Sequence, residues 1–224
     1  MAESELHAEV ARQIAALDIR RHHPLIVSDA DEVIVRFMAG FERYLDVRGL
    51  YFTWRSYRLD GNILGKADDA ALTASDIHAL LDDFFAAHTD SLEPVAGAAA
   101  ALGALSGRAQ IVVLSNLPLA YRENRRRWLV HHGIDYPLVV NIGAKGPAVR
   151  ALAARAAAPT CFIDDSPTHH ETVARDAGHV LRLHFTADDR LARLVGPAQA
   201  SHHRAGDWAS ARAIIEAEFA ALGH

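Results

Sequence analysis

Short apolar runs alternate with segments of helical periodicity along most of this chain. Five apolar runs predict buried strands, at residues 25–28, 110–114, 138–141, 160–163 and 179–184. Apolar residues that recur every three or four positions predict helices at 3–18, 95–105, 119–132, 148–157, 168–177 and 207–222. Because strands and helices alternate, the sequence predicts an α/β fold in which layers of helices cover a parallel sheet.

About 80 residues separate the first predicted strand from the second, far more than one crossover helix needs. Within this insertion, apolar spacing predicts helices at 36–48 and 74–88, and Thr73 with Asp76 forms a capping-box pattern before the second helix. Between them, YFTWRSYRLDGNI is rich in β-forming aromatic residues and carries the turn signal Asp60-Gly61, which favours a hairpin. We therefore predict a core domain at 1–35 and 93–224 and a small, mainly helical insertion at 36–92.

Composition and charge narrow the functional classes. With 50% hydrophobic and 23% charged residues, the 224-residue chain is typical of a globular protein. Its net charge of −5 gives no general attraction for nucleic acid or anionic membranes, and the run Arg125-Arg126-Arg127 is typical of a solvated helix face. The 14 histidines, without acidic or cysteine ligands at metal-binding spacing, are typical of exposed loops and helix ends.

The sequence also bears on where the protein works. The N-terminal segment has no apolar stretch of signal-peptide length, and no run reaches the roughly 18 apolar residues that a membrane span needs. The single cysteine, Cys161, excludes an intrachain disulfide and fits a reducing compartment. We expect a soluble cytoplasmic protein that binds neither nucleic acid nor membranes.

Polar side chains follow four of the predicted strands at the point where each strand ends. These ends carry, in chain order, Asp29 and Asp31, Ser115 and Asn116, Lys145, and Asp164 and Asp165. Because the carboxyl ends of parallel strands meet at one edge of a sheet, we expect these groups to lie close together. Four carboxylates, a hydroxyl and an ammonium group could hold a divalent cation and a phosphoryl group.

In this order, these residues resemble the four motifs of the haloacid dehalogenase superfamily. Asp29-Ala30-Asp31-Glu32-Val33 resembles the first motif, Asp-x-Asp-x-Thr/Val; Ser115 resembles the second, Lys145 the third and Asp164-Asp165 the fourth. The resemblance extends from about residue 25 to residue 178 and implies a Rossmann-like three-layer core. One departure is Glu32, where the family most often has glycine.

The resemblance implies a magnesium-dependent phosphohydrolase that acts on a small phosphorylated metabolite through an aspartyl-phosphate intermediate. In that mechanism Asp29 attacks phosphorus, while Asp31 acts first as general acid and then as general base. Ser115, Asn116 and Lys145 would bind phosphoryl oxygens. The implied Mg²⁺ ligands are Asp29, the backbone carbonyl of Asp31, and Asp165, with Asp164 as a further ligand or as support.

The insertion at 36–92 resembles a cap domain of the kind that follows the first motif. A cap of this kind would cover the site and contact the substrate. The candidate contact residues are Trp54, Arg55, Tyr57 and Arg58. Aromatic clusters of this composition are also typical of ordinary packing.

Other activities on the same scaffold stay open at this stage. A phosphoryl mutase would transfer the group between substrate hydroxyls, and a dehalogenase would cleave a carbon–halogen bond. Asp31 argues against the dehalogenase, which needs no acid at that position. A phosphate-sensing or partner-binding domain without turnover is a further alternative. The sequence favours no particular oligomeric state.

Overall fold

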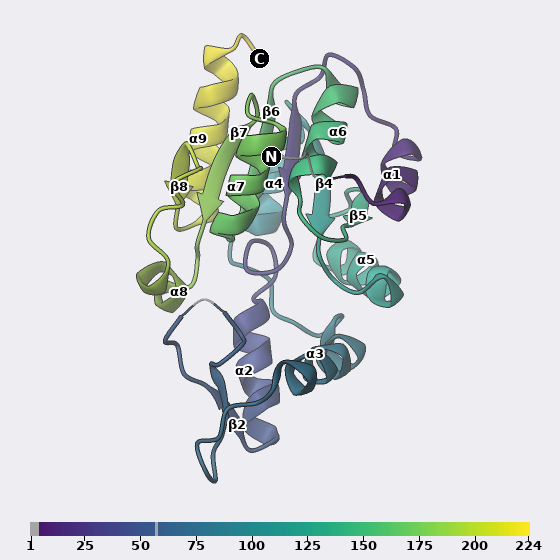
Figure 1. The fold of residues 1–224 in the computed structure, drawn as a ribbon. Helices are drawn as coiled ribbons and strands as arrows, with labels where there is room; N and C mark the ends of the chain where they lie inside the picture. The colour runs from purple at the N-terminus through teal and green to yellow at the C-terminus, as the bar shows by residue number, and fades with distance from the viewer. Residues whose placement is uncertain (1–4, 57) are drawn as a thin grey trace.

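A parallel sheet forms the centre of the computed structural model, which describes residues 5–56 and 58–224. Within this part of the chain, six strands lie in the order β5-β4-β1-β6-β7-β8, and every neighbouring pair is parallel (Figure 1). The strands are β1 (Leu25–Ser28), β4 (Gln110–Ser115), β5 (Leu138–Val140), β6 (Thr160–Asp164), β7 (Leu181–Phe185) and β8 (His203–Ala205). The predicted α/β fold with a parallel sheet is confirmed.

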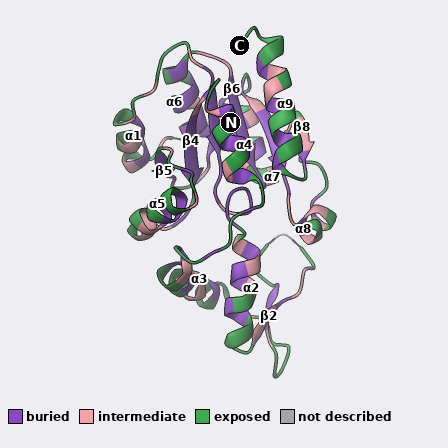
Figure 2. Cartoon of the chain, turned by 180° about the vertical axis from the view of Figure 1, so that it is seen from behind, coloured by how far each residue is buried: buried purple, intermediate pink, exposed green. Residues whose placement is uncertain are grey.

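Two layers of helices cover the sheet. On one face lie α1 (Ala8–Ala15), α6 (Gly146–Ala156) and α7 (Pro167–Asp176), and on the other lie α4 (Ala98–Leu105), α5 (Arg122–His131) and α9 (Trp208–Ala221). Successive residues of β1 point to opposite faces, so Leu25 and Val27 pack with the first group of helices and Ile26 with the second. Buried residues are accordingly concentrated on the strands and on the inward helix faces (Figure 2).

Three features differ from the sequence prediction. The fifth helix begins only at Arg122, because Pro118 precedes a 3-10 turn at Leu119–Tyr121. The edge strand β8 and the short helix α8 (Asp189–Leu194) were not predicted. β8 has three residues and is mostly polar, and α8 has only six residues, so neither carries an apolar pattern long enough to predict an element.

The insertion contains α2 (Phe37–Val47), β2 (Leu50–Phe52), β3 (Ile63–Gly65) and α3 (Ala74–His88), and it lies beyond the carboxyl ends of the sheet strands (Figure 1). β2 and β3 pair antiparallel, as the turn signal predicts, and Thr73 and Asp76 form the predicted capping box before α3. Phe37, Phe41 and Phe84 pack between the two helices at ring-centroid distances of 5.1 to 5.5 Å.

The chain enters and leaves the insertion through two segments that pair with each other. Arg36 N donates to Glu93 O at 2.9 Å, and Val95 N donates to Ile34 O at 2.7 Å. This short antiparallel contact places the insertion directly above the loop that follows β1. Among the described residues, no helix is both long and apolar enough to cross a bilayer.

Candidate active site

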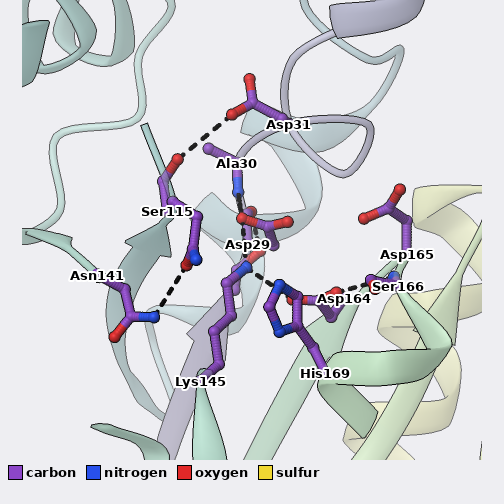
Figure 3. Close-up of polar contacts among 12 residues, drawn as sticks. Asp29, Ala30, Asp31, Ser115, Asn141, Lys145, Asp164, Asp165, Ser166 and His169 are labelled. Atoms are coloured by element: carbon purple, nitrogen blue, oxygen red, sulfur yellow. Dashed lines mark hydrogen bonds and ion pairs between the residues drawn. The ribbon is translucent and has the colours of Figure 1, made fainter. Parts of the chain in front are cut away.

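Asp29 follows β1 at the centre of the carboxyl edge of the sheet. Its backbone N–H continues the parallel ladder by donating to Ile163 O of β6 at 2.8 Å. Its Oδ1 accepts a hydrogen bond from Ala30 N at 2.7 Å, and the residue is only 7% exposed (Figure 3). The end of the ladder and the next backbone amide therefore hold this carboxylate in one orientation.

Lys145 joins Asp29 to Asp164. Its Nζ lies 2.7 Å from Asp29 Oδ1 and 2.7 Å from Asp164 Oδ2, and all three side chains are buried (Figure 3). Burial alone would lower the pKa of Lys145, but the two carboxylates outweigh this effect and raise it. The ammonium group is therefore charged at neutral pH.

The two carboxylates bound by Lys145 respond differently to their surroundings. Burial raises the pKa of Asp29 to about 7, although Lys145 acts in the opposite direction. Burial also acts to raise the pKa of Asp164, but there the lysine prevails and holds the pKa below its ordinary value. Asp164 is thus the carboxylate that carries the charge balancing Lys145 when no other cation is bound.

The acidic residues at this edge fit a hard divalent cation. One carboxylate oxygen from each of Asp29, Asp164 and Asp165 lies within 4.8 Å of the other two, and all three residues are buried. Buried carboxylates gathered at this distance repel one another unless positive charge compensates them. Oxygen donors of this kind are the ligands that Mg²⁺ prefers.

Asp31 lies at the same edge but contacts different partners. Its Oδ1 accepts from Nη2 of Arg125 on α5 at 2.8 Å, and its Oδ2 accepts from Ser115 Oγ at 3.4 Å. Arg125 has a fully buried side chain, so the prediction of a solvated helix face is wrong for this residue. Among the described residues, its Nε and Nη1 have no hydrogen-bond acceptor.

Asn116 and Asn141 close the edge on the side of β4 and β5. Asn141 Nδ2 donates to Asn116 Oδ1 at 2.9 Å, and Asn116 Nδ2 donates to Gly143 O at 2.8 Å. These bonds tie the end of β4 to the loop that carries Lys145. Ser115, the residue before Asn116, is fully buried at the end of β4.

Glu32 stands at the position where the haloacid dehalogenase motif most often has glycine, and its backbone has a conformation that favours glycine. Its φ of +61° lies in the left-handed region that favours glycine. Its carboxylate accepts a hydrogen bond at 2.5 Å from Met38 N, in the first turn of α2, where the helix presents unpaired amide groups. The strained backbone is therefore accompanied by a bond that fixes the insertion to the core.

Burial also affects Glu32 and the histidines near the site. It raises the pKa of Glu32 to about 7 and lowers the pKa of His169 to about 4. His170 and His184 are fully buried, and their Nε2 atoms lie 2.9 and 3.0 Å from the carbonyl oxygens of Asp164 and Asp165, respectively. The prediction of exposed histidines is wrong for these two, which hold the backbone of the acidic loop.

A cavity of about 370 Å³ opens above this edge, between the core and the insertion. The described residues that line it are Asp29, Asp31, Glu32, Phe37, Met38, Leu59, Leu81, Phe85, Asn116, Lys145, Asp165, Ser166, His169 and Leu191. Five of the seven residues predicted at the strand ends therefore face one cavity. Ser115 and Asp164 lie behind it and contact its wall residues Asp31 and Lys145.

Of the four residues predicted to contact substrate from the insertion, Trp54, Arg55 and Arg58 are not among the described residues that line the cavity. Trp54 Nε1 donates to Glu42 Oε1 at 2.7 Å, and its ring lies 3.9 Å from the guanidinium of Arg190. Arg55 and Arg58 are exposed, and Tyr57 lies outside the described residues. Trp54 thus links the hairpin of the insertion to α8 of the core.

Comparisons with known proteins agree with this architecture. Neither a protein-family model nor a curated protein matches the sequence. A haloacid dehalogenase-like protein of unknown function from Agrobacterium tumefaciens is 19% identical, with a TM-score of 0.60 over 88% of this chain and 99% of that one. A HAD family hydrolase from Deinococcus radiodurans, solved with bound phosphate and sodium, is 16% identical, with a TM-score of 0.57 over 88% of this chain and 96% of that one.

A third similar structure carries a larger ligand. A mutant of CbbY from Rhodobacter sphaeroides, solved in complex with xylulose-(1,5)bisphosphate, is 16% identical, with a TM-score of 0.55 over 83% of this chain and 94% of that one. The chain thus has the fold of the haloacid dehalogenase-like proteins. The predicted Rossmann-like three-layer core is confirmed.

Sequence reasoning missed Arg125, Asn141, His170 and His184. Arg125 and the histidines carry no distinctive spacing, and a polar residue in a helix is ordinarily exposed. Asn141 had a signal, because it directly follows a short apolar strand, as Asp29 does.

Proposed function

We propose that this protein is a Mg²⁺-dependent phosphomonoesterase that works through an aspartyl-phosphate at Asp29. The observation that supports this best is the arrangement around that residue. Asp29 faces the cavity, its Oδ1 is held by Ala30 N and Lys145, and two further carboxylates lie within 4.8 Å of it. Because both contacts use Oδ1, Oδ2 is the oxygen available to attack phosphorus.

Asp31 has the position that a general acid and base requires. It faces the same cavity as Asp29, and Ser115 and Arg125 hold it apart from the Lys145 cluster. In the first step it would give a proton to the leaving oxygen as the P–O bond of the ester breaks. In the second it would take a proton from the water that attacks the aspartyl-phosphate, releasing phosphate and regenerating Asp29.

Asp29 and Asp165, with Asp164 beside them, are the residues that would hold the cation. When bound, Mg²⁺ would offset the repulsion between the carboxylates and the phosphate dianion. Asp164 also receives Lys145 and the backbone N–H of Ser166, the latter at 2.8 Å, so we assign it mainly to positioning Lys145. Lys145 and Asn116 would contact the phosphoryl oxygens from the floor of the cavity.

We assign residues 36–92 to a cap over a core formed by 1–35 and 93–224. Its helices α2 and α3 supply four residues of the cavity wall, and paired linkers connect it to the core. The ligands of two similar structures, phosphate in the Deinococcus hydrolase and xylulose-(1,5)bisphosphate in CbbY, support a small phosphorylated substrate.

The experiment that tests the function separates the two carboxylates of the first motif. With an activated aryl phosphate and Mg²⁺, Asp29→Asn should lose turnover and form no covalent intermediate. Asp31→Asn should accumulate the intermediate, because the leaving group needs little protonation while the second step lacks its base. Intact-protein mass spectrometry after an acid quench should show a gain of roughly 80 Da on Asp31→Asn only, as nucleophilic catalysis requires.

The exposed Asp135→Asn is the matched control and should retain wild-type turnover. Omitting Mg²⁺ or adding excess chelator should abolish turnover by the wild type and by Asp135→Asn. Steady turnover by Asp29→Asn, or a phosphoryl group mapped to another residue, would contradict the assignment of the nucleophile.

A further inference from the structure

The cavity above Asp29 has two chemically different halves. Its floor, formed by loops of the core, carries the charged and amide groups that would bind the metal and the phosphoryl group. Its upper wall is apolar and consists of Phe37, Met38, Leu59, Leu81, Phe85 and Leu191. We infer that the substrate is a phosphate monoester of an apolar alcohol, with an alkyl or aryl group seated against this wall. The inference rests on the proposed function.

The apolar wall comes from both domains. Phe37 and Met38 begin α2, Leu81 and Phe85 lie one turn apart on α3, and Leu191 belongs to α8 of the core. Met38, Phe85 and Leu191 are each less than 9% exposed, so the wall is packed from behind. An apolar group bound here would leave water and pack against a preformed apolar surface, which favours binding.

Charged groups that would recognise a second anion are absent from the upper wall among the described residues. Arg55 and Arg58 are exposed and do not line the cavity. Arg190, beside Leu191, is engaged by Asp188 and Glu42 at 2.8 Å each. The one cation in the described lining is Lys145, which belongs to the floor. A bisphosphate would therefore find no partner for its second phosphate.

Glu32, Ser166 and His169 also line the cavity but are not part of the apolar wall, and among the described residues only the Nδ1 of His169 is a buried, unpaired polar atom of this lining. Glu32 accepts from Met38 N, and Asn116 belongs to the floor that would bind the phosphoryl group. The hydroxyls of a sugar or polyol seated against the six apolar side chains would give up water without gaining equivalent partners, which is unfavourable. We therefore predict that a ligand with an apolar group binds more tightly than a ligand with a polyhydroxylated group of the same length.

The test measures affinity without turnover. Non-hydrolysable ethyl-, butyl- and hexylphosphonate are titrated into the protein by calorimetry with Mg²⁺, alongside 2,3,4-trihydroxybutylphosphonate as the polar match for the butyl compound. Each added methylene group should tighten binding about fourfold until the wall is covered. Butylphosphonate should bind at least about tenfold more tightly than its trihydroxy analogue.

Two leucines on α3 supply the matched variants. Leu80 and Leu81 are both half-buried and packed on the same core, but of the two only Leu81 lines the cavity. Leu81→Asn should weaken hexylphosphonate binding about tenfold and leave methylphosphonate unaffected, as expected for lost apolar burial. Leu80→Asn should change neither affinity.

The outcomes separate this inference from the proposed function. Affinity that is independent of chain length, or that favours the trihydroxy compound, overturns the inference even if phosphate esters are hydrolysed. Chain-length-dependent binding that Leu81→Asn reduces supports it. If such binding occurs but no phosphate ester is hydrolysed with Mg²⁺, the proposed function fails and the assignment of the wall to an apolar group stands.

Discussion

Replacing Lys145 by methionine should destabilise the metal-free protein strongly while roughly keeping the side chain's length. The ammonium-bearing side chain is 1% exposed and lies 2.7 Å from each of two carboxylates, whose side chains are 9% and 0% exposed. At an effective dielectric constant of about 20, each contact is worth about 6 kcal/mol before desolvation is counted. Removing one partner of a buried ion pair generally costs about 3–5 kcal/mol net, because a charge stays buried without compensation.

The expected loss for Lys145→Met is therefore about 3–5 kcal/mol in the free energy of unfolding. The assay is urea unfolding followed by tryptophan fluorescence, in chelator at pH 7.5. Lys66→Met is the control, because Lys66 pairs with Asp46 at 2.5 Å with both side chains more than 40% exposed. An exposed pair of this kind contributes at most about 1 kcal/mol.

Mg²⁺ gives a second measurement on the same variant. The cation would compensate the same carboxylates without competition from the ammonium, so it should stabilise Lys145→Met more than the wild type. At a roughly hundredfold excess over its dissociation constant, a bound ion stabilises by about 2.7 kcal/mol. A loss below about 1 kcal/mol in chelator, similar to that of Lys66→Met, would refute the reasoning that Lys145 compensates a buried acidic cluster.

Three further predictions concern residues around the site. Because burial raises the pKa of Glu32 from 4.5 in the unfolded chain to about 7, the metal-free fold is most stable with respect to this group below pH 4.5 and loses up to about 3 kcal/mol of unfolding free energy as pH rises through 7. Urea unfolding at pH 5 and pH 8 should show a smaller difference in stability for Glu32→Gln than for the wild type. Gly146→Ala would place a Cβ against the carbonyl oxygen of Thr172, so both the stability of the fold and the rate of turnover should fall. Gly103→Ala, where the Cβ meets no other atom, is the control and should raise the free energy of unfolding by about 0.5–1 kcal/mol. Arg125→Met should change the free energy of unfolding by less than about 1 kcal/mol, because two nitrogens of Arg125 lack acceptors among the described residues and the Asp31 side chain is 23% exposed. If Asp31 is the general base, as proposed, stopped-flow assays of Arg125→Met should show slower hydrolysis of the proposed aspartyl-phosphate.

The architecture was predictable because its signals are local and repeated. Each central strand is an apolar run buried on both faces, and each flanking helix shows its own periodicity. The capping box at Thr73 and the turn signal at Asp60-Gly61 fixed the ends of elements within the insertion. Strand β8 could not be predicted, because the residues His203–Ala205 show no strand pattern of their own. They form a strand only through their pairing with β7.

The site was predictable only where it coincides with strand ends. A parallel sheet brings those ends together whatever the intervening sequence, so Asp29, Ser115 and Asp164 meet by topology alone. Arg125 comes from the middle of a helix, and only the tertiary packing of α5 turns it inward. The wall residues Leu81 and Phe85 likewise belong to the amphipathic pattern of α3. That pattern does not distinguish apolar residues that pack in the core from apolar residues that line a cavity.

Arg125, which the sequence did not predict at the site, contacts one of the two neighbouring carboxylates Asp29 and Asp31. Asp29 and Asp31 are two residues apart, and two negative charges so close together repel each other. In this chain each contacts a different buried cation. Lys145 contacts Asp29 as well as Asp164, Arg125 contacts Asp31, and the two cations come from different elements on opposite sides of the sheet. Since neither cation contacts the other's carboxylate, removing one leaves the second pair in place. The charges of the proposed nucleophile, Asp29, and of the proposed proton-transferring group, Asp31, are therefore compensated by different side chains, and a substitution at one cation can change one group without the other.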